Sequence, residues 1–267
     1  MSTIVFLGGG RITSAMLAGL RLAKVRHRLV VHDRNPNKLR NLKKEFKVQV
    51  EPSLEKAVGR ADILIIAVRP ASVHELLGAI GGVRRPVLAV SVAAGVPLRM
   101  LRKSLGPPAR WVRAMPSPVC RSGRGLTAIT FPGLLPSRDR QRVRELFASF
   151  GAVVEVSELR FDAFTVTYSS SHGYHALATL AEAAERAGLD RKTALLASAH
   201  ALGDGIVAWR EGQHSLEDLL EEAATPGGIA ATTMAGADAA GYRHAVRQGV
   251  LKGLRRARAN ARGRRRN

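Results

Sequence analysis

Short apolar runs alternate with segments of helical spacing through the first half of the chain. Apolar residues at every third or fourth position predict helices over residues 14–22, 39–46, 53–58 and 73–80. Right-handed βαβ connections between the runs predict an α/β fold with a doubly wound sheet. The run at 62–68 is apolar at nearly every position, as in a parallel strand buried on both faces. The predicted strands are residues 4–7, 27–33, 48–50, 62–68, 86–92, 110–114, 125–131 and 152–156.

The pattern changes near residue 158, where the chain becomes rich in Ala, Leu and Glu with helical spacing and no clear strand. We expect two domains, residues 1–157 and residues 158–267, the second all-helical with a basic C-terminal tail. So small a helical domain would bury its remaining apolar faces against a second subunit, which predicts a homodimer or higher homo-oligomer. Its predicted helices are 176–188, a second one through 208, 216–224, and a last one that begins near residue 229 or later.

A glycine cluster, Gly8-Gly9-Gly10, follows the first predicted strand directly. The spacing fits G-x-G-x-x-small, with Thr13 as a misfit where Gly or Ala packs a helix on its strand. Gly8 would make the tight turn, and Gly10 would let a phosphate approach the backbone. The N–H groups of the following helix could then hold a pyrophosphate. A glycine-rich turn that binds nothing is the alternative.

An acid, Asp33, ends the second predicted strand about 20 residues beyond the glycines, where a ribose-binding carboxylate is expected. Arg34 and Asn35 follow it, and an arginine there can receive the 2′-phosphate of NADP. Asp33 could bind the ribose hydroxyls of NAD, or it could cap the turn at Asn35-Pro36. The sequence therefore favours NADPH and leaves NADH possible.

Composition narrows the class of protein. A chain of 267 residues that is 46% hydrophobic can bury one large core or two modest ones, and it has no apolar run of the roughly 20 residues that span a bilayer. The first strand begins by residue 3, which leaves no room for a signal peptide, and the single cysteine, Cys120, suits a reducing cytoplasm as an inert side chain. We therefore expect a cytoplasmic protein with no membrane partner.

The formal net charge of +21 lies partly in residues 252–267. Such charge could steer anionic ligands or hold nucleic acid. The chain carries no interleaved aromatic platform and no known nucleic-acid-binding module. We therefore interpret the charge as solvated surface plus a frayed basic tail, do not expect nucleic acid as a partner, and assign no residue to a metal.

Six short motifs, which follow one another in the order and spacing of a known family, carry a more specific signal than the glycine turn alone. With them, the chain resembles the pyrroline-5-carboxylate reductase family over nearly its full length. The resemblance implies an N-terminal Rossmann domain, a helical domain that interlocks in a dimer, and reduction of a cyclic imine carboxylate by NADPH or sometimes NADH. The motifs are Phe6-Leu7-Gly8-Gly9-Gly10, Ala67-Val68-Arg69-Pro70, Ser91-Val92-Ala93-Ala94-Gly95, Arg113-Ala114-Met115-Pro116, Gly123-x-Gly125 and Thr225-Pro226-Gly227-Gly228.

The resemblance also implies site residues. For the substrate it points to Ser117 and to the loop Pro226, Gly227 and Gly228, whose helix-opening N–H groups could bind a carboxylate. For the cofactor it points to Gly8, Gly9, Gly10, Arg11, Ile12, Asp33, Arg34, Asn35, Ser53, Ala67, Val68, Pro70, Ala93, Ala94, Met115 and Pro116.

Departures from the family pattern affect the chemistry. Where the family carries a threonine that meets the imine nitrogen, this chain reads Ile229-Ala230. Imine reduction needs a donor at nitrogen. His172 and Tyr174 are the best local candidates, because the resemblance places their segment facing the cofactor. A hydrogen-bonded histidine at a helix start and a packed tyrosine are the structural alternative. Three functions stay open: imine reduction with an altered substrate, ordinary proline formation, and nucleotide binding without catalysis.

Overall fold

The computed structural model describes residues 1–261 and divides them into two compact units. The first unit is Met1–Tyr168 together with the chain from Gly253 onward, and the second is Ser169–Lys252. The helix α7 (Glu158–Thr167) thus groups with the first unit. The domain boundary after residue 157 stays a prediction.

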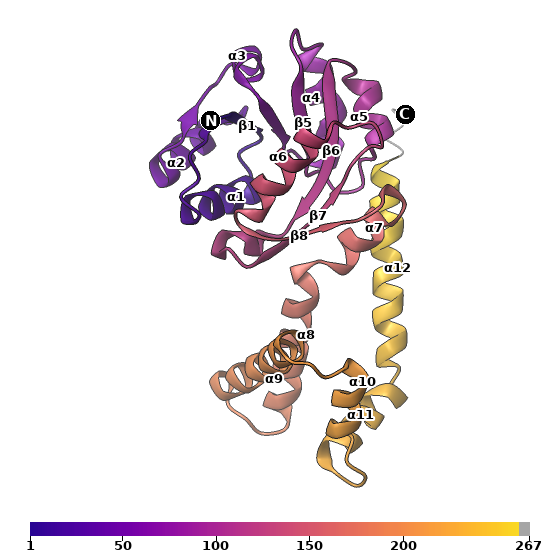
Figure 1. Ribbon diagram of the computed structural model, residues 1–267. Helices are drawn as coiled ribbons and strands as arrows, with labels where there is room; N and C mark the ends of the chain where they lie inside the picture. Colours follow the sequence, from indigo (N-terminus) through magenta and orange to yellow (C-terminus); the bar gives the residue numbers. More distant parts are fainter. Residues whose placement is uncertain (262–267) are drawn as a thin grey trace, which may run out of the picture. The chain divides into compact units, whose positions relative to one another are not determined.

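One eight-stranded sheet forms the first unit, in the order β3-β2-β1-β4-β5-β6-β7-β8 (Figure 1). The first six strands are mutually parallel, whereas β7 runs antiparallel to β6 and carries β8 parallel to itself. This reversal places the ends of β7 and β8 at the opposite edge from the ends of the other strands. The strands are β1 (Thr3–Leu7), β2 (Arg28–His32), β3 (Gln49–Val50), β4 (Ile63–Ile66), β5 (Val87–Ser91), β6 (Ala109–Pro116), β7 (Gly125–Thr130) and β8 (Gly151–Glu155).

Helices cover both faces of this sheet, because its strands are apolar on both sides. In β1, Ile4 and Phe6 join one buried cluster while Val5 and Leu7 join the other, as the two-residue period of a strand requires. The first cluster is covered by α1 (Arg11–Leu22), α2 (Pro36–Phe46) and α6 (Ser137–Ala148). The second is covered by α3 (Leu54–Arg60), α4 (Val73–Ile80) and α5 (Leu98–Ser104). Two short 3-10 turns, η1 (Pro70–Ser72) and η2 (Pro118–Ser122), connect elements, and Cys120 of η2 belongs to the first cluster.

Two of the six helices that cover the sheet, α5 and α6, were not predicted from the sequence. In α6 the arginines at 138, 140, 142 and 144 look like solvated charge. Val143, Leu146 and Phe147 nevertheless share one buried face at helical spacing. The charged face obscured that apolar stripe.

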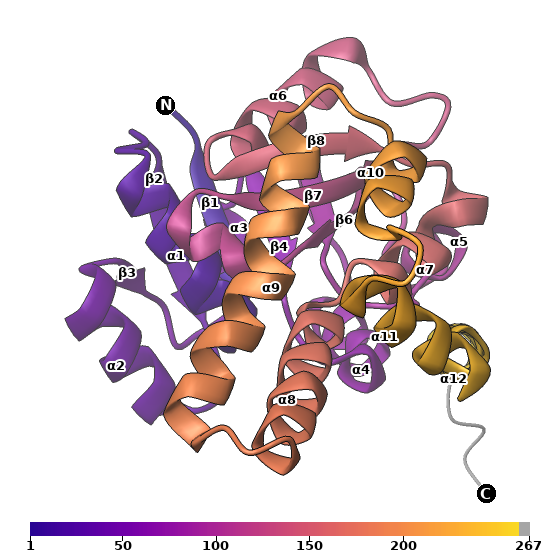
Figure 2. The ribbon, with the colours of Figure 1, turned by 90° about the horizontal axis from the view of Figure 1, so that it is seen from below.

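The second unit is all-helical, as predicted. It contains α8 (Ser170–Arg186), α9 (Arg191–Glu211), α10 (Leu216–Ala223), α11 (Ile229–Ala239) and most of α12 (Tyr242–Asn260). The helices α8 and α9 lie side by side (Figure 2). The last predicted helix is instead two helices, because Gly241 at φ +86° follows the end of α11 and separates it from α12. No helix within residues 1–261 is long and apolar enough to cross a membrane.

The frayed-tail interpretation is wrong for residues 253–260, which form the end of α12 and pack on the first unit. Ala257 is buried, and the Asn260 side-chain amide donates a hydrogen bond of 3.2 Å to the Ala94 carbonyl. Gly95 lies so close to Ala257 that an added Cβ would stand 2.2 Å from the Ala257 carbonyl oxygen. The rest of the predicted tail, residues 262–267, lies outside the described residues.

Candidate active site at the carboxyl edge of the sheet

The glycine turn joins β1 to α1 at the carboxyl edge of the parallel strands. Gly8 takes φ +111° and donates its N–H to the His32 carbonyl at 2.8 Å. A Cβ on Gly8 would lie 2.6 Å from the Ala67 carbonyl oxygen, so both the backbone angle and the space require glycine.

Gly10 serves a different purpose, since nothing lies within 4 Å of the place a Cβ would take. It is the N-cap of α1 at φ −86°, and no side chain caps the first turn of that helix. Arg11 and Ile12 open the helix, so the N–H groups of its first turn point to the space above Gly10. Uncapped N–H groups beside open space fit a pyrophosphate.

Thr13 is part of the turn and not a misfit. Its side chain is fully buried, and its hydroxyl donates a 2.5 Å hydrogen bond to the Gly8 carbonyl. The hydroxyl therefore fixes the turn from the helix side, a role that Gly or Ala in this position could not fill.

Asp33 holds the glycine turn from the other side. One carboxylate oxygen accepts the Gly9 N–H at 2.7 Å, and the other accepts the Asn35 N–H at 2.8 Å, as a turn cap does. The side chain is only 12% exposed, and Lys38 lies 3.5 Å from it. Partial burial works against ionisation, but these N–H donors and the Lys38 charge outweigh it and lower the pKa of Asp33. The turn-capping alternative thus describes the Asp33 contacts.

Arg34 lies in the open at the same edge, paired with a residue that the sequence did not suggest. Its guanidinium is 2.7 Å from Glu75 of α4, and the two side chains are 76% and 66% exposed. An exposed pair of this kind is worth about 0–1 kcal/mol, so an incoming phosphate can displace Glu75. Asn35 caps α2 through Asn37 and Lys38. Lys38 was also not named as a site residue from the sequence, although its position in the first helical turn after Asn35 places it near Asp33.

The remaining cofactor candidates of the first unit also lie at or just beyond strand ends on this edge. The register aligns Leu7 with His32 and Ile66, and Ile66 with Ser91. The segments that follow these strands therefore stand side by side. They carry Ala67, Val68, Pro70, Ala93 and Ala94, while Met115 and Pro116 end β6 and Ser53 follows β3.

Two of the predicted hydroxyls are engaged in capping. The Ser53 hydroxyl accepts the Lys56 N–H at 3.3 Å and begins α3. The Ser117 hydroxyl, in a buried side chain, accepts the Val119 N–H at 3.3 Å and begins η2. Each hydroxyl can still donate its own proton to a ligand.

A buried arginine near the end of β6 supports this edge, and although it belongs to one of the six motifs, no role was assigned to it from the sequence. Arg113 is 2% exposed and contacts Glu158 at 3.0 Å and Asp162 at 2.9 Å, with its guanidinium 4.4 Å from the Phe161 ring centre. Glu158 also accepts the Leu98 N–H at 3.0 Å. Because a buried charge is stable only when paired, this cluster fixes α7 to β6 and α5.

The candidates of the second unit are described within that unit alone. His172 and Tyr174 lie in the first turns of α8, both exposed, and Tyr174 is 69% exposed. The Tyr174 exposure disagrees with the alternative of a packed tyrosine. In the loop Pro226–Gly228, Gly227 takes φ +75° and Gly228 begins α11 with no side-chain cap, leaving N–H groups available to an anion.

Comparison with known proteins gives the family. A family model described as NADP oxidoreductase, coenzyme F420-dependent, matches residues 3–95, and one described as pyrroline-5-carboxylate reductase dimerisation matches residues 158–260. Pyrroline-5-carboxylate reductase of Synechocystis is 30% identical over 256 residues, covering 94% of this chain and 95% of the relative. The chain belongs to the pyrroline-5-carboxylate reductase family.

Solved structures share its fold. A pyrroline-5-carboxylate reductase of Streptococcus pyogenes matches with a TM-score of 0.88 at 23% identity, covering 97% of this chain and 98% of that one. The pyrroline carboxylate reductase of Plasmodium falciparum, with NADP bound, matches with a TM-score of 0.86 at 21% identity over 97% and 98% of the two chains.

Family membership confirms the broader predictions. The fold class is confirmed, a Rossmann-type domain followed by a helical dimerisation domain. The family consists of NAD(P)H-dependent oxidoreductases that act on C=N bonds, which agrees with the predicted enzyme class and cofactor. The match to a dimerisation model indicates a homo-oligomer.

Proposed function

We propose that this protein reduces the C=N bond of pyrroline-5-carboxylate with NADPH, and less well with NADH. The supporting observation is the glycine turn, in which Gly8 is sterically required and Gly10 stands open beside an uncapped helix start. The names of the relatives support the substrate. A bound dinucleotide would supply the hydride.

In this proposal the chain's own residues bind and orient. The first-turn N–H groups of α1, next to Arg11 and Ile12, hold the pyrophosphate, while Arg34 and Asn35 meet the 2′-phosphate. Ala67, Val68, Pro70, Ala93, Ala94, Met115 and Pro116 form the apolar nicotinamide side, from which water is excluded.

The proposal also assigns roles to the predicted substrate residues. The Gly228 N–H donates to the Thr225 carbonyl at 2.9 Å, so the first-turn N–H groups of α11 that follow it bind the substrate carboxylate, beside Pro226 and Gly227. Ser117 borders the reacting face. His172 or Tyr174 donates a proton to the imine nitrogen, since Ile229 and Ala230 have no hydroxyl to do so.

A second candidate follows from those same two residues. Ile229 and Ala230 replace polar side chains by apolar ones at the loop that meets the substrate in the family. A larger or less polar cyclic imine would fit that change.

Steady-state oxidation of NADPH with pyrroline-5-carboxylate, beside a panel of cyclic imines, tests both candidates. Turnover of pyrroline-5-carboxylate at ordinary enzyme rates, about 1 s⁻¹ or faster, supports the first candidate. Fast turnover of another imine alone supports the second. Absence of turnover together with absence of NADPH and NADH binding by calorimetry would refute both.

The donor assignment has its own test. His172→Ala or Tyr174→Phe should lower kcat by about 100-fold, the scale of one general acid, while NADPH affinity stays within about twofold. Tyr242→Phe is a matched control, because Tyr242 is similarly exposed at the start of another helix. Full rates in both variants would exclude these side chains as donors.

We also propose that the oligomer is a homodimer formed through the predicted second domain, residues 158–267, in the cytoplasm and without nucleic acid. Large apolar side chains are exposed there and need a partner surface. Light scattering of the pure protein tests this, and a monomer at micromolar concentration would contradict it. The exposed set includes Leu196, Ile206, Val207, Trp209, Leu216 and Ile229.

A further inference from the structure

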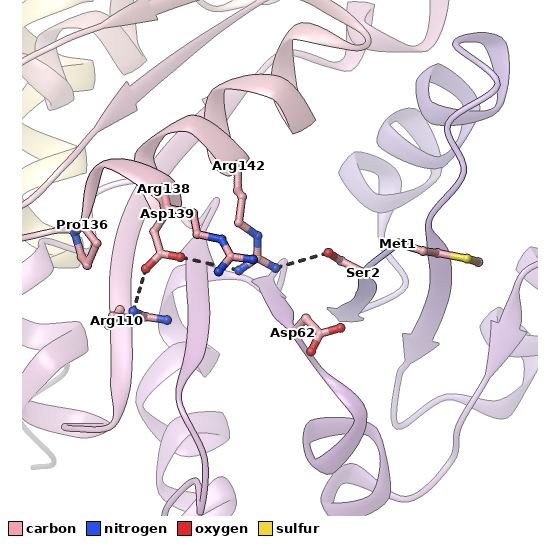
Figure 3. A pocket seen from close by; sticks show the side chains of 8 residues that line it. All are labelled: Met1, Ser2, Asp62, Arg110, Pro136, Arg138, Asp139 and Arg142. Atoms are coloured by element: carbon pink, nitrogen blue, oxygen red, sulfur yellow. Dashed lines mark hydrogen bonds and ion pairs between the residues drawn. The ribbon is translucent and has the colours of Figure 1, made fainter.

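A second cavity lies at the amino edge of the sheet, opposite the strand ends that carry the glycine turn. It has a volume of about 450 Å³ and is lined from β6, from α6, and from the segments before β1 and β4. The function proposed above does not use it. Figure 3 shows its lining residues, Met1, Ser2, Asp62, Arg110, Pro136, Arg138, Asp139 and Arg142.

A buried carboxylate arranges two of the arginines on the wall of this cavity. Asp139, 4% exposed, lies 2.8 Å from Arg110 and 3.5 Å from Arg142, between the two guanidinium groups (Figure 3). Arg142 also donates a hydrogen bond of 3.3 Å to the Ser2 hydroxyl. These contacts hold both guanidinium groups in place before any ligand arrives.

The third arginine is unengaged. Arg138 is exposed at the start of α6 and makes no hydrogen bond or ion pair with any residue of the described chain. The Arg110 Nε atom is buried without a hydrogen-bond partner within residues 1–261. The first turn of α6 has no side-chain cap, which adds the positive end of a helix dipole.

The carboxylates of the cavity are already committed. Asp62 accepts the Thr3 N–H at 2.8 Å and lies 3.2 Å from Arg85, a fourth arginine at this edge. The Thr3 N–H, followed by Arg85 and Arg142, lowers the pKa of Asp62. Burial, then the chain's amino terminus and Arg142, lowers the pKa of the nearby His27. Positive charge therefore predominates around the cavity.

We propose that this cavity binds a small polyanion, one with at least two phosphate or carboxylate groups held by Arg138, Arg142 and Arg110. A guanidinium group can donate two parallel hydrogen bonds to the oxygens of a phosphate or of a carboxylate. A volume of about 450 Å³ suits a small molecule better than a polymer. A ligand of this kind would relieve the repulsion among the arginines.

Calorimetric titration of the full chain with sodium tripolyphosphate, and separately with citrate, tests the proposal. Saturating NADPH is present, so that the glycine turn cannot take the anion. We expect sub-millimolar binding of at least one of the two anions, and the pair of titrations separates phosphate from carboxylate preference. The absence of binding heat with both anions would overturn the proposal.

Arg138→Gln is the decisive variant, because Arg138 supports no fold contact and its loss leaves the structure intact. We expect it to weaken the anion by about tenfold, the value of one charge-assisted hydrogen bond. Arg99→Gln makes the same charge change at an exposed position of α5 away from the cavity and should alter binding by less than about twofold. Equal effects of the two variants would mean non-specific charge attraction and would overturn the proposal.

Discussion

Gly8→Ala and Gly10→Ala should separate folding from cofactor binding, although the two glycines are two residues apart. An alanine at position 8 must hold φ +111° and place its Cβ 2.6 Å from the Ala67 carbonyl oxygen. The backbone strain costs about 1–2 kcal/mol. The forced shift of packed backbone costs about 1–3 kcal/mol more. A loss of about 2–5 kcal/mol lowers the Tm of a protein of this size by roughly 5–15 °C.

Gly10→Ala should do the opposite. Its φ of −86° suits alanine and nothing lies within 4 Å of the new Cβ, so the free energy of unfolding should change by less than about 1 kcal/mol. The Cβ would instead occupy the space assigned to the pyrophosphate and raise the Kd for NADPH by about tenfold or more.

The assay combines thermal unfolding without cofactor and calorimetric titration with NADPH on both variants. The reasoning is refuted if Gly10→Ala binds NADPH as tightly as the unchanged protein, or if it loses as much Tm as Gly8→Ala. Either result would mean that the open space above Gly10 is not where the dinucleotide lies.

The remaining predictions concern the ribose end of the site, the loss of stability at low pH and the end of α12. Arg34→Ala should weaken NADPH binding by about tenfold and NADH binding by less than about twofold. Glu75→Gln should tighten NADPH binding by up to about fivefold, because it frees Arg34 from an exposed pair. Equal effects on the affinities for both cofactors, measured by titration, would contradict the phosphate role. The lowered pKa of Asp33 contributes stability at neutral pH that is lost as the pH falls below the ordinary pKa of 3.8 and through the folded value. In Asp33→Asn, the free energy of unfolding measured with urea should therefore depend less on pH over that range. An unchanged pH dependence would contradict this. Removal of residues 253–267 should lower the Tm and weaken NADPH binding, because Ala257 and Asn260 would no longer cover Ala94–Gly95. Removal of residues 262–267 alone is the control and should change neither quantity. An unchanged Tm and NADPH affinity in the variant that ends at Lys252 would refute the packing role.

Family membership sharpens one question about the chemistry. The relatives are named for a single substrate, yet the loop at Ile229–Ala230 has lost the hydroxyls that the resemblance expects there. Either a side chain such as His172 supplies the proton or the substrate differs. The kinetic panel and the donor variants distinguish these outcomes, because a changed substrate alters which imine turns over and a changed donor alters kcat on the same imine.

The sequence alone determined the strands, most of the helices and the position of the glycine turn. These depend on local physics: a two-residue period at Ile4–Leu7, a 3.6-residue period in α1, and glycine where φ must be positive. Residues close along the chain set these features, so their order can be read directly.

The tertiary structure decided what the polar side chains do. Asp33 bonds Gly9 across 24 positions, Arg34 meets Glu75 across 41, and Asn260 reaches Ala94 across 166. The arginines of α6 look like solvated charge until Asp139 and the amino edge of the sheet bring them around one cavity. A charged side chain has no periodic signature of its partner, because its pairing is fixed by how distant elements pack and not by its neighbours in the chain.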